Sequence, residues 1–149
     1  MGETSLTFRK LTIDDADAVA LHDFICFGEH DAWSREEFFY AAKSPRNEFF
    51  VAESEGRIIA CAGAAIHSDT AELQTLSVDP NFRGRDLGSI MLIKLLRAVI
   101  KRGATFVILE VRPSNTTAIK LYKDFGFQIV DRIENFYGDE DAWVMAQEF

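Results

Sequence analysis

The chain has 149 residues, 48% of them hydrophobic and 27% charged, with a formal net charge of −8. This length and composition suffice for one sizeable core, so we expect a single domain over residues 1–149. The acidic balance, with a sequence pI near 4.8, argues against nucleic-acid binding through a basic surface, and the sequence shows neither a membrane-spanning apolar run nor a signal peptide.

The first half of the chain is predicted to form a strand, two helices and three further strands. Thr12 can cap a helix over residues 12–27, in which apolar residues recur at helical spacing. Ser34 and Glu37 form a capping box that opens a second helix over 34–43. Alternating apolar residues and a tight Glu-Gly turn predict the strands, which cover residues 6–10, 48–54, 57–67 and 71–78.

The second half is predicted to alternate helices and strands. A helix over about 87–102 ends at Gly103, and another runs from about 115 to 125, capped by Asn115 and ended by Gly126. The remaining strands are expected over 105–111, 127–136 and 141–147. The first of these is a continuous apolar run, typical of a strand covered on both faces. The order βααβββαβαββ predicts an α/β domain with a mixed sheet and helices on both of its faces.

The most informative stretch joins the strand 71–78 to the helix 87–102. This loop contains Arg83, Gly84, Arg85 and Gly88. Because the first turn of a helix has unpaired N–H groups and a partial positive charge, it is a ready site for an anion. The two arginines beside it therefore indicate a phosphate-bearing ligand, although they are equally compatible with solvated surface charges.

Three residues outside this loop are candidates for chemistry. Glu110 ends an otherwise apolar strand, where burial would raise the pKa of its carboxyl; the alternative is a solvated charge at a strand end. Tyr122 lies on the predicted helix 115–125 and is either a core aromatic or a hydroxyl at the rim of a site. Asn115 is explained as a helix cap, with or without a further role.

These motifs, taken in order, resemble the GNAT acetyltransferase superfamily over nearly the whole chain. The motifs that carry the resemblance are Val78-Asp-Pro, Arg83-Gly-Arg-Asp-Leu-Gly88, Leu109-Glu-Val-Arg112, Asn115, Leu121-Tyr122 and Phe125-Gly-Phe127. Within the superfamily the chain is similar to the RimI-type N-terminal protein acetyltransferases. That similarity rests on Trp33-Ser34, the Leu-Glu-Val-Arg strand end, Asn135-Phe-Tyr137 and Glu140-Asp-Ala142.

The resemblance implies a GNAT fold, in which a mostly antiparallel sheet splays between the strands 71–78 and 105–111 to admit acetyl-CoA. It implies Glu110 as the general base and Tyr122 as the general acid toward the departing thiolate. The residues implied in contact with the acceptor are Trp33, Glu110 and Tyr137. Those implied in acetyl-CoA binding are Leu76, Val78, Arg83, Gly84, Arg85, Asp86, Leu87, Gly88, Ser89, Asn115 and Tyr122.

The implied function is direct, metal-free transfer of acetyl from acetyl-CoA to the N-terminal α-amine of a protein. An α-amine, with a pKa near 8, needs about 2.5 pKa units less help from a base than a lysine does. We expect Tyr122 to keep a phenol pKa near its usual value of about 10, and the backbone N–H groups near Val78 to hold the developing oxyanion.

The resemblance implies an N-terminal alanine, or a similar small residue, of a ribosomal protein as the acceptor. An acidic enzyme would attract a basic ribosomal tail, which is consistent with that acceptor. Two alternatives stay open: a lysine or small-molecule amine as acceptor, or a non-catalytic acyl-CoA-binding module.

Asp86 departs from the pyrophosphate loop of the superfamily, where a glycine is usual. Aspartate tolerates a positive φ better than most residues, but its carboxylate would repel a pyrophosphate. We expect its side chain to turn outward, with Arg83 and Arg85 offsetting its charge.

The remaining polar and aromatic residues have simpler interpretations. Cys26 and Cys61 lie in apolar surroundings and are expected to be reduced core thiols of a cytoplasmic protein. Trp33 and Trp143 anchor either the core or the acceptor groove. The histidines show no metal-ligand spacing; they are His22, His30 and His67.

Overall fold

The computed structural model describes residues 5–149. Residues 1–4, which belong to the segment expected to contain no signal peptide, lie outside the described residues. The strands are β1 (Leu6–Lys10), β2 (Asn47–Ser54), β3 (Arg57–His67), β4 (Thr70–Val78), β5 (Phe106–Val111), β6 (Gln128–Ile133) and β7 (Ala142–Glu148). The helices are α1 (Ala16–Asp31), α2 (Arg35–Lys43), α3 (Leu87–Lys101) and α4 (Thr116–Asp124), with short 3₁₀ turns η1 (Ile13–Asp15) and η2 (Pro80–Phe82).

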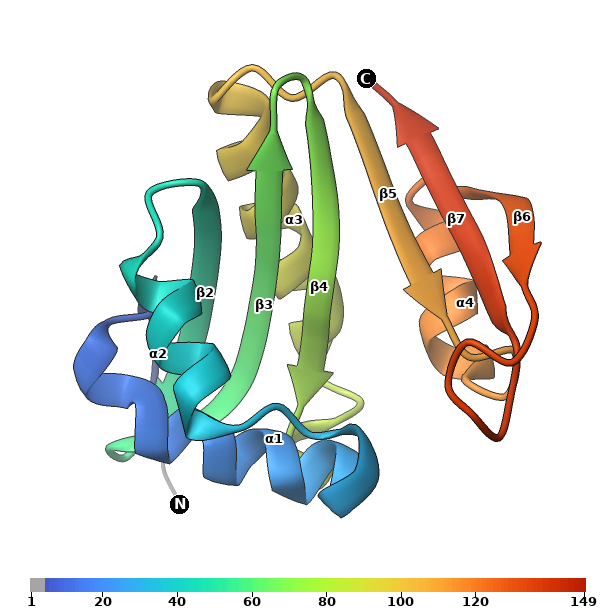
Figure 1. The fold of residues 1–149 in the computed structure, drawn as a ribbon. Coiled ribbons are helices and arrows are strands. Elements are labelled where there is room, and N and C mark those ends of the chain that lie inside the picture. Colours follow the sequence, from blue (N-terminus) through green and yellow to red (C-terminus); the bar gives the residue numbers. More distant parts are fainter. Residues whose placement is uncertain (1–4) are drawn as a thin grey trace.

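The strands form one seven-stranded sheet in the order β1-β2-β3-β4-β5-β7-β6. Its neighbours pair antiparallel except for β4 and β5, which are parallel. Helices cover both faces: α1 and α2 lie on the near side of the sheet in Figure 1, and α3 and α4 on the far side. The predicted mixed, mostly antiparallel sheet is confirmed.

Two groups of buried residues hold these layers together. The larger lies between the sheet and the helices α3 and α4, where Met91, Leu92 and Leu95 present one apolar stripe of α3. The smaller lies between the sheet and the helices α1 and α2. No side chain fits at Gly63, because a Cβ there would overlap the ring of Phe49, its partner across β2 and β3. Each fully buried large side chain contributes about 1.5–3 kcal/mol to folding.

The first predicted helix differs from its prediction at both ends. It opens with the 3₁₀ turn η1, in which the Asp15 carboxylate accepts the Thr12 N–H at 2.7 Å. Gly28, with φ 78° and ψ 178°, interrupts α1 near the predicted end at residue 27. A glycine adopts this backbone conformation at low cost, and the chain turns there toward α2.

Two strand predictions are wrong in part. β6 ends at Ile133 rather than at residue 136, because the chain turns at Asn135, whose N–H donates to Asp141 Oδ1 at 2.9 Å. β5 is not covered on both faces: its buried residues alternate with half-buried ones, which include Ile108 and Glu110. The half-buried face is the one opposite α3 and α4, and in Figure 1 neither α1 nor α2 extends over β5 on that side.

The sheet opens between β4 and β5. Their register holds only at Thr70↔Phe106, Ala71↔Val107 and Glu72↔Ile108, and within residues 5–149 the ladder goes no further. The β3–β4 register moves from Ala64↔Leu73 to Gly63↔Thr75, so Gln74 is an extra residue in β4. Such a bulge bends and twists its strand, and Figure 1 shows β5 leaning away from β4 toward their carboxyl ends.

Candidate active site

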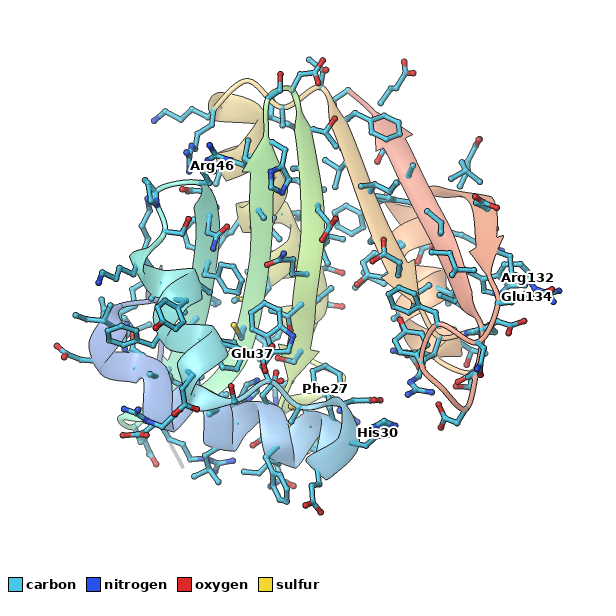
Figure 2. All side chains as sticks on the ribbon, viewed as in Figure 1. Phe27, His30, Glu37, Arg46, Arg132 and Glu134 are labelled. Carbon is cyan, nitrogen blue, oxygen red and sulfur yellow. The ribbon has the colours of Figure 1, made fainter. Side chains whose placement is uncertain are left out.

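A cavity of about 470 Å³ lies at the gap between β4 and β5. Its walls come from α1 and the link to α2, from both strands, from α4, and from the connection between β6 and β7. Figure 2 shows Phe27 and His30 at the end of α1 that borders it. The predicted site residues that line the cavity are Trp33, Leu76, Glu110, Asn115, Tyr122 and Tyr137.

Glu110 occupies the diverging part of β5, two positions beyond the last residue that pairs with β4. Its side chain is half-buried in the cavity wall. Burial raises the pKa of the Glu110 carboxyl, and the charge of Glu72 in the same wall raises it further. A carboxylate with a raised pKa is a stronger base, so Glu110 is suited to take a proton from an ammonium group.

Tyr122 enters the cavity from α4 and is only 5% exposed. Its ring packs 5.8 Å from that of Phe127, centroid to centroid. Burial, with a smaller contribution from Tyr137, raises the pKa of the Tyr122 phenol well above its ordinary value. The expectation of a nearly unshifted phenol pKa was therefore wrong, because α4 holds this ring within the core. The hydroxyl stays protonated at neutral pH and can act as a donor.

Three further predicted residues serve the fold and line the cavity at once. Asn115 Oδ1 accepts the Ala118 N–H at 3.2 Å and so caps α4. The ring of Trp33 lies 5.2 Å from that of Phe38. Tyr137 lies in the β6–β7 connection, where the guanidinium carbon of Arg112 is 4.2 Å from its ring centroid.

The free edge of β4 presents backbone groups to the gap. The Asp79 N–H donates to the Ile59 carbonyl on β3, and backbone groups along a strand point alternately to either side. The N–H and C=O groups of Leu76 and Val78 therefore point away from β3, toward the gap. Leu76 lines the cavity, whereas Val78 lies beyond its lining.

The loop after β4 and the start of α3 lie outside the cavity lining. The predicted residues here are Arg83, Gly84, Arg85, Asp86, Leu87, Gly88 and Ser89. Gly84 has φ +80°, and the N-terminal N–H groups of α3 receive no side-chain cap. The side chain of Leu87 is buried in the core, so Leu87 offers the site only its backbone.

Asp86 takes up the positive φ that the sequence suggested. It precedes α3 with φ 59° and ψ 17°, is exposed, and makes no capping hydrogen bond. Among residues 5–149, neither arginine of the loop forms an ion pair with it. Arg83 Nε instead donates to the Val78 carbonyl at 3.1 Å, and the Arg85 guanidinium carbon lies 5.0 Å from the Phe82 ring centroid. Arg83 and Arg85 can therefore offset the negative charge of Asp86 only by longer-range electrostatic attraction, not through a direct ion pair.

The open edge of β4, the uncapped start of α3 and two exposed arginines fit an extended, phosphate-bearing acyl donor. A Cβ at Gly88 would make an ordinary 3.4 Å contact with Leu121 Cδ2, so packing against α4 does not by itself require a glycine there. The residues that would hold the donor are those of the β4 edge and of the loop from Arg83 to Ser89.

Several cavity residues were missed by the sequence reasoning: Asp23, Phe27, Asp31, Glu72, Arg112 and Phe136. Asp23 is 1% exposed; its Oδ2 accepts the Trp33 N–H at 2.8 Å, and its Oδ1 has no partner within the described residues. Burial raises the pKa of Asp23 to about 6. Its position four residues after Val19, on the apolar side of the helix, was the available signal.

The cysteines and buried histidine lie outside the cavity. Cys61 is buried as predicted, but Cys26 is half-buried, and its thiol donates to the Val78 carbonyl at 3.5 Å. Burial raises the pKa of Cys26 to about 11, so its thiol is not activated. His22 Nε2 lies 2.8 Å from Ser77 Oγ, and burial lowers the pKa of His22 to about 4.

In residues 5–149, no group of three or more His, Cys, Asp or Glu side chains is placed to hold a metal ion. No helix in this part of the chain is both long and apolar enough to cross a membrane. A second cavity of about 470 Å³, beside the Arg102–Glu48 ion pair, contains none of the predicted site residues.

Residues 16–127 match the model of the Acetyltransferase (GNAT) family. The chain belongs to this family. It is therefore an acetyl-CoA-dependent N-acetyltransferase.

Relatives place this GNAT enzyme with the RimI-type group. It is 36% identical over 118 residues to the [ribosomal protein bS18]-alanine N-acetyltransferase of Salmonella typhimurium, covering 76% of this chain and 79% of that protein. It is 33% identical over 149 residues to the N-alpha-acetyltransferase RimI of Mycobacterium tuberculosis, covering 96% and 92%. The crystal structure of the ribosomal-protein-S18-alanine N-acetyltransferase from Escherichia coli superposes with a TM-score of 0.87 at 30% identity, covering 97% of this chain and 94% of that one.

Proposed function

We propose that this GNAT enzyme acetylates the N-terminal α-amine of a protein, with Glu110 as general base and Tyr122 as general acid. The observation that carries the proposal is the position of Glu110 in the cavity wall, where β5 has parted from β4. Bound there, acetyl-CoA supplies an activated thioester acyl group. No cysteine of residues 5–149 lines this cavity, which supports direct transfer to the amine.

Glu110 prepares the amine for attack. An α-ammonium group has a pKa near 8 and is mostly protonated at neutral pH. Glu110, directly or through one water, removes the proton once the ammonium is enclosed. Because the pKa of Glu110 is raised, it differs less from the pKa of the ammonium, and the proton transfer is less unfavourable. For a lysine ammonium, with a pKa of about 10.4, the pKa difference from the same carboxylate would be larger.

Tyr122 faces the departing sulfur in this proposal. Because burial keeps its hydroxyl protonated, it acts as the general acid by donating a hydrogen bond that strengthens as negative charge develops on the sulfur. The N–H groups of Leu76 and Val78, which point toward the gap, are placed to bind the oxyanion that develops on the acyl carbon.

The acceptor we propose is the N-terminal alanine of ribosomal protein bS18, in the cytoplasm where ribosomes work. The relatives from Salmonella typhimurium and Escherichia coli, which are named as ribosomal protein S18-alanine N-acetyltransferases, support this acceptor. The net charge of −8 supports it as well, because an acidic enzyme attracts a basic polypeptide.

A peptide panel tests the proposal. Peptides with the bS18 N-terminal sequence would be incubated with enzyme and acetyl-CoA, and intact mass and fragmentation would locate the acetyl group. Matched peptides carry either a blocked α-amine with free lysines, or a free α-amine without lysine. We expect acetylation only where the α-amine is free. Labelling confined to lysine, or thiol release without any peptide acceptor, would contradict the proposal.

A further inference from the structure

One arginine beside the cavity bonds to both of its walls. Arg112 follows β5 directly, two residues after Glu110. Its Nε and Nη2 each donate to one oxygen of Asp31 at 3.0 Å, and its Nη1 donates to Asp139 Oδ1 at 2.9 Å and to Glu140 Oε1 at 3.1 Å. We call these four residues the Arg112 cluster.

The partners of Arg112 come from separate segments. Asp31 ends α1, on the wall that also carries Trp33, whereas Asp139 and Glu140 belong to the β6–β7 connection. Within residues 5–149, the contacts of Arg112 with Asp31 are the only hydrogen bonds and ion pairs that join α1 to the chain after Val111. The two walls of the entrance are thus linked through one side chain.

The cluster is built more firmly than an ordinary surface ion pair. The Arg112 side chain is only 19% exposed, and that of Asp31 is 34% exposed. The pair is bidentate, a geometry that fixes both partners and is stronger than a single contact. Glu140 is itself held in place, since it accepts both the N–H and the hydroxyl of Ser114 at 2.8 Å.

Four of the five N–H groups of Arg112 donate to carboxylates, which leaves a single N–H of Nη2 without a carboxylate partner among the described residues. Its Nε and both terminal nitrogens already donate to carboxylates, and its flat face lies against the ring of Tyr137 at 4.2 Å. Phe136 packs edge-on against that ring, with 4.9 Å between ring centroids. Arg112 is therefore placed to position other residues, rather than to bind a phosphate or carboxylate of a substrate.

We infer that Arg112 is a positioning residue that sets the width of the acceptor entrance by clamping the end of α1 to the β6–β7 connection and to Tyr137. The inference rests on the proposed function, since the entrance is the path of the peptide N-terminus. Without Arg112, the carboxylates of Asp31, Asp139 and Glu140 face one another uncompensated, and the two walls separate. The acceptor then loses its fixed path, whereas the β4 edge and the α3 start stay as they are.

The test compares Arg112→Ala with Arg132→Ala by steady-state kinetics on an acceptor peptide. Arg132 is a matched control because it lies in β6 and pairs with Asp141 at 2.9 Å, yet it does not line the cavity; Figure 2 shows it with Glu134 at the outer edge of the sheet. For Arg112→Ala we expect the KM for peptide to rise about tenfold or more, with kcat and the KM for acetyl-CoA within about twofold of wild type. Arg132→Ala should leave all three constants unchanged.

A second variant guards against general loss of the fold. Asp31→Asn weakens only the link to α1 and leaves Arg112 bonded to the β6–β7 connection. We expect it to raise the peptide KM in the same direction, and its effect to be less than additive with Arg112→Ala, as for residues in direct contact.

The outcomes separate this inference from the proposed function. If the wild-type enzyme acetylates no peptide N-terminus, both fall. If it does, and the peptide KM of Arg112→Ala and Asp31→Asn is unchanged, only the role of Arg112 falls. The same holds if the KM values for peptide and acetyl-CoA rise together with loss of kcat, because that pattern indicates general loosening.

Discussion

Glu110 and Tyr122 line the same cavity, and burial raises the pKa of both. The chemical consequences are opposite, because a raised pKa strengthens a carboxylate as a base and weakens a phenol as an acid. A thiol has an ordinary pKa of about 8.5, so a full proton transfer from Tyr122 to a free thiolate is uphill. In the proposed mechanism, Tyr122 therefore contributes mainly by donating a hydrogen bond to the sulfur while negative charge develops on it.

Replacing Glu110 by Gln should lower kcat/KM by about 100-fold or more, the usual contribution of a positioned base. The wild-type enzyme is expected to lose activity as the pH falls through the raised pKa of Glu110, because the protonated carboxyl cannot accept a proton. The pH dependence of kcat/KM should show this acidic limb in wild type, whereas in Glu110→Gln a limb set by the acceptor α-ammonium itself, with a pKa near 8, should replace it.

Glu72→Gln is the matched control, since Glu72 lines the same cavity and its charge helps to raise the pKa of Glu110. Removing that charge should move the acidic limb to lower pH and keep it present. A Glu110→Gln enzyme with the full wild-type profile would reject Glu110 as the base.

Asp86 is the second residue with a measurable consequence. Its carboxylate is exposed and makes no capping bond to the first turn of α3, so water screens it from a bound pyrophosphate. We expect Asp86→Gly to tighten acetyl-CoA binding by no more than about threefold in calorimetry at physiological salt. A gain of about tenfold, close to 1.4 kcal/mol, would mean that the carboxylate repels the donor.

At the scale of elements, α1 combines two buried groups whose pKa values shift in opposite directions. Burial lowers the pKa of His22 to about 4 and raises that of Asp23 to about 6, so the fold favours the neutral form of each. Below its unfolded pKa of about 6.5, His22 costs stability as the pH falls toward 4. Asp23 gives stability that is complete near pH 4 and is lost as the pH rises through about 6. The two contributions offset each other over the same range.

Single replacements in α1 should separate them. In denaturant titrations between about pH 4 and 6.5, His22→Gln should become more stable relative to wild type as the pH falls, and Asp23→Asn less stable. The slope for each approaches about 1.4 kcal/mol per pH unit. Glu29→Gln, on the exposed side of the same helix, should follow wild type. Equal pH dependence in all four proteins would show that neither group is neutral in the folded state.

The elements that the sequence predicted well are those whose boundaries are set locally. Ser34 accepts the Glu37 N–H, and Asn115 accepts that of Ala118, three residues along the chain in each case. The start of the splay depends instead on the bulge at Gln74 against β3, and β6 ends where the chain turns at Asn135. These features arise from pairing between segments that are distant in sequence, and local propensity and hydrophobic periodicity carry no information about such pairing.

The same contrast between locally determined features and features that depend on distant segments applies to the candidate site. Glu110, Tyr122 and Asn115, which line the cavity, could be named as candidates because each belongs to a short motif on one element. Arg112 stood in the same motif as Glu110, but its main partner, Asp31, is 81 residues away in sequence. The only sequence signal for Asp23 was a charged residue on the apolar side of a predicted helix. That signal does not predict that its carboxylate accepts the Trp33 N–H. Both require knowledge of how α1 lies against the sheet.

At the scale of the whole molecule, the acidic surface acts differently on the two substrates. The net charge is −8, so a basic peptide is attracted and the anionic acyl donor is repelled except near Arg83 and Arg85. The screening length falls from about 10 Å at 0.1 M salt to about 3 Å at 1 M. Added salt therefore weakens the long-range attraction of a basic peptide, whereas short contacts inside the cavity change less.

Salt dependence should accordingly follow the charge of the acceptor. Raising the ionic strength from about 0.05 to about 0.5 M should lower kcat/KM for a lysine- and arginine-rich peptide by about tenfold. The fall should be small for a neutral peptide with the same first residue, measured at saturating acetyl-CoA. Because the two peptides present the same α-amine to Glu110, the difference isolates attraction by the enzyme surface. If both peptides lost activity equally, the acidic surface would have no part in choosing the acceptor, and the basic character of a ribosomal tail would cease to support the proposed function.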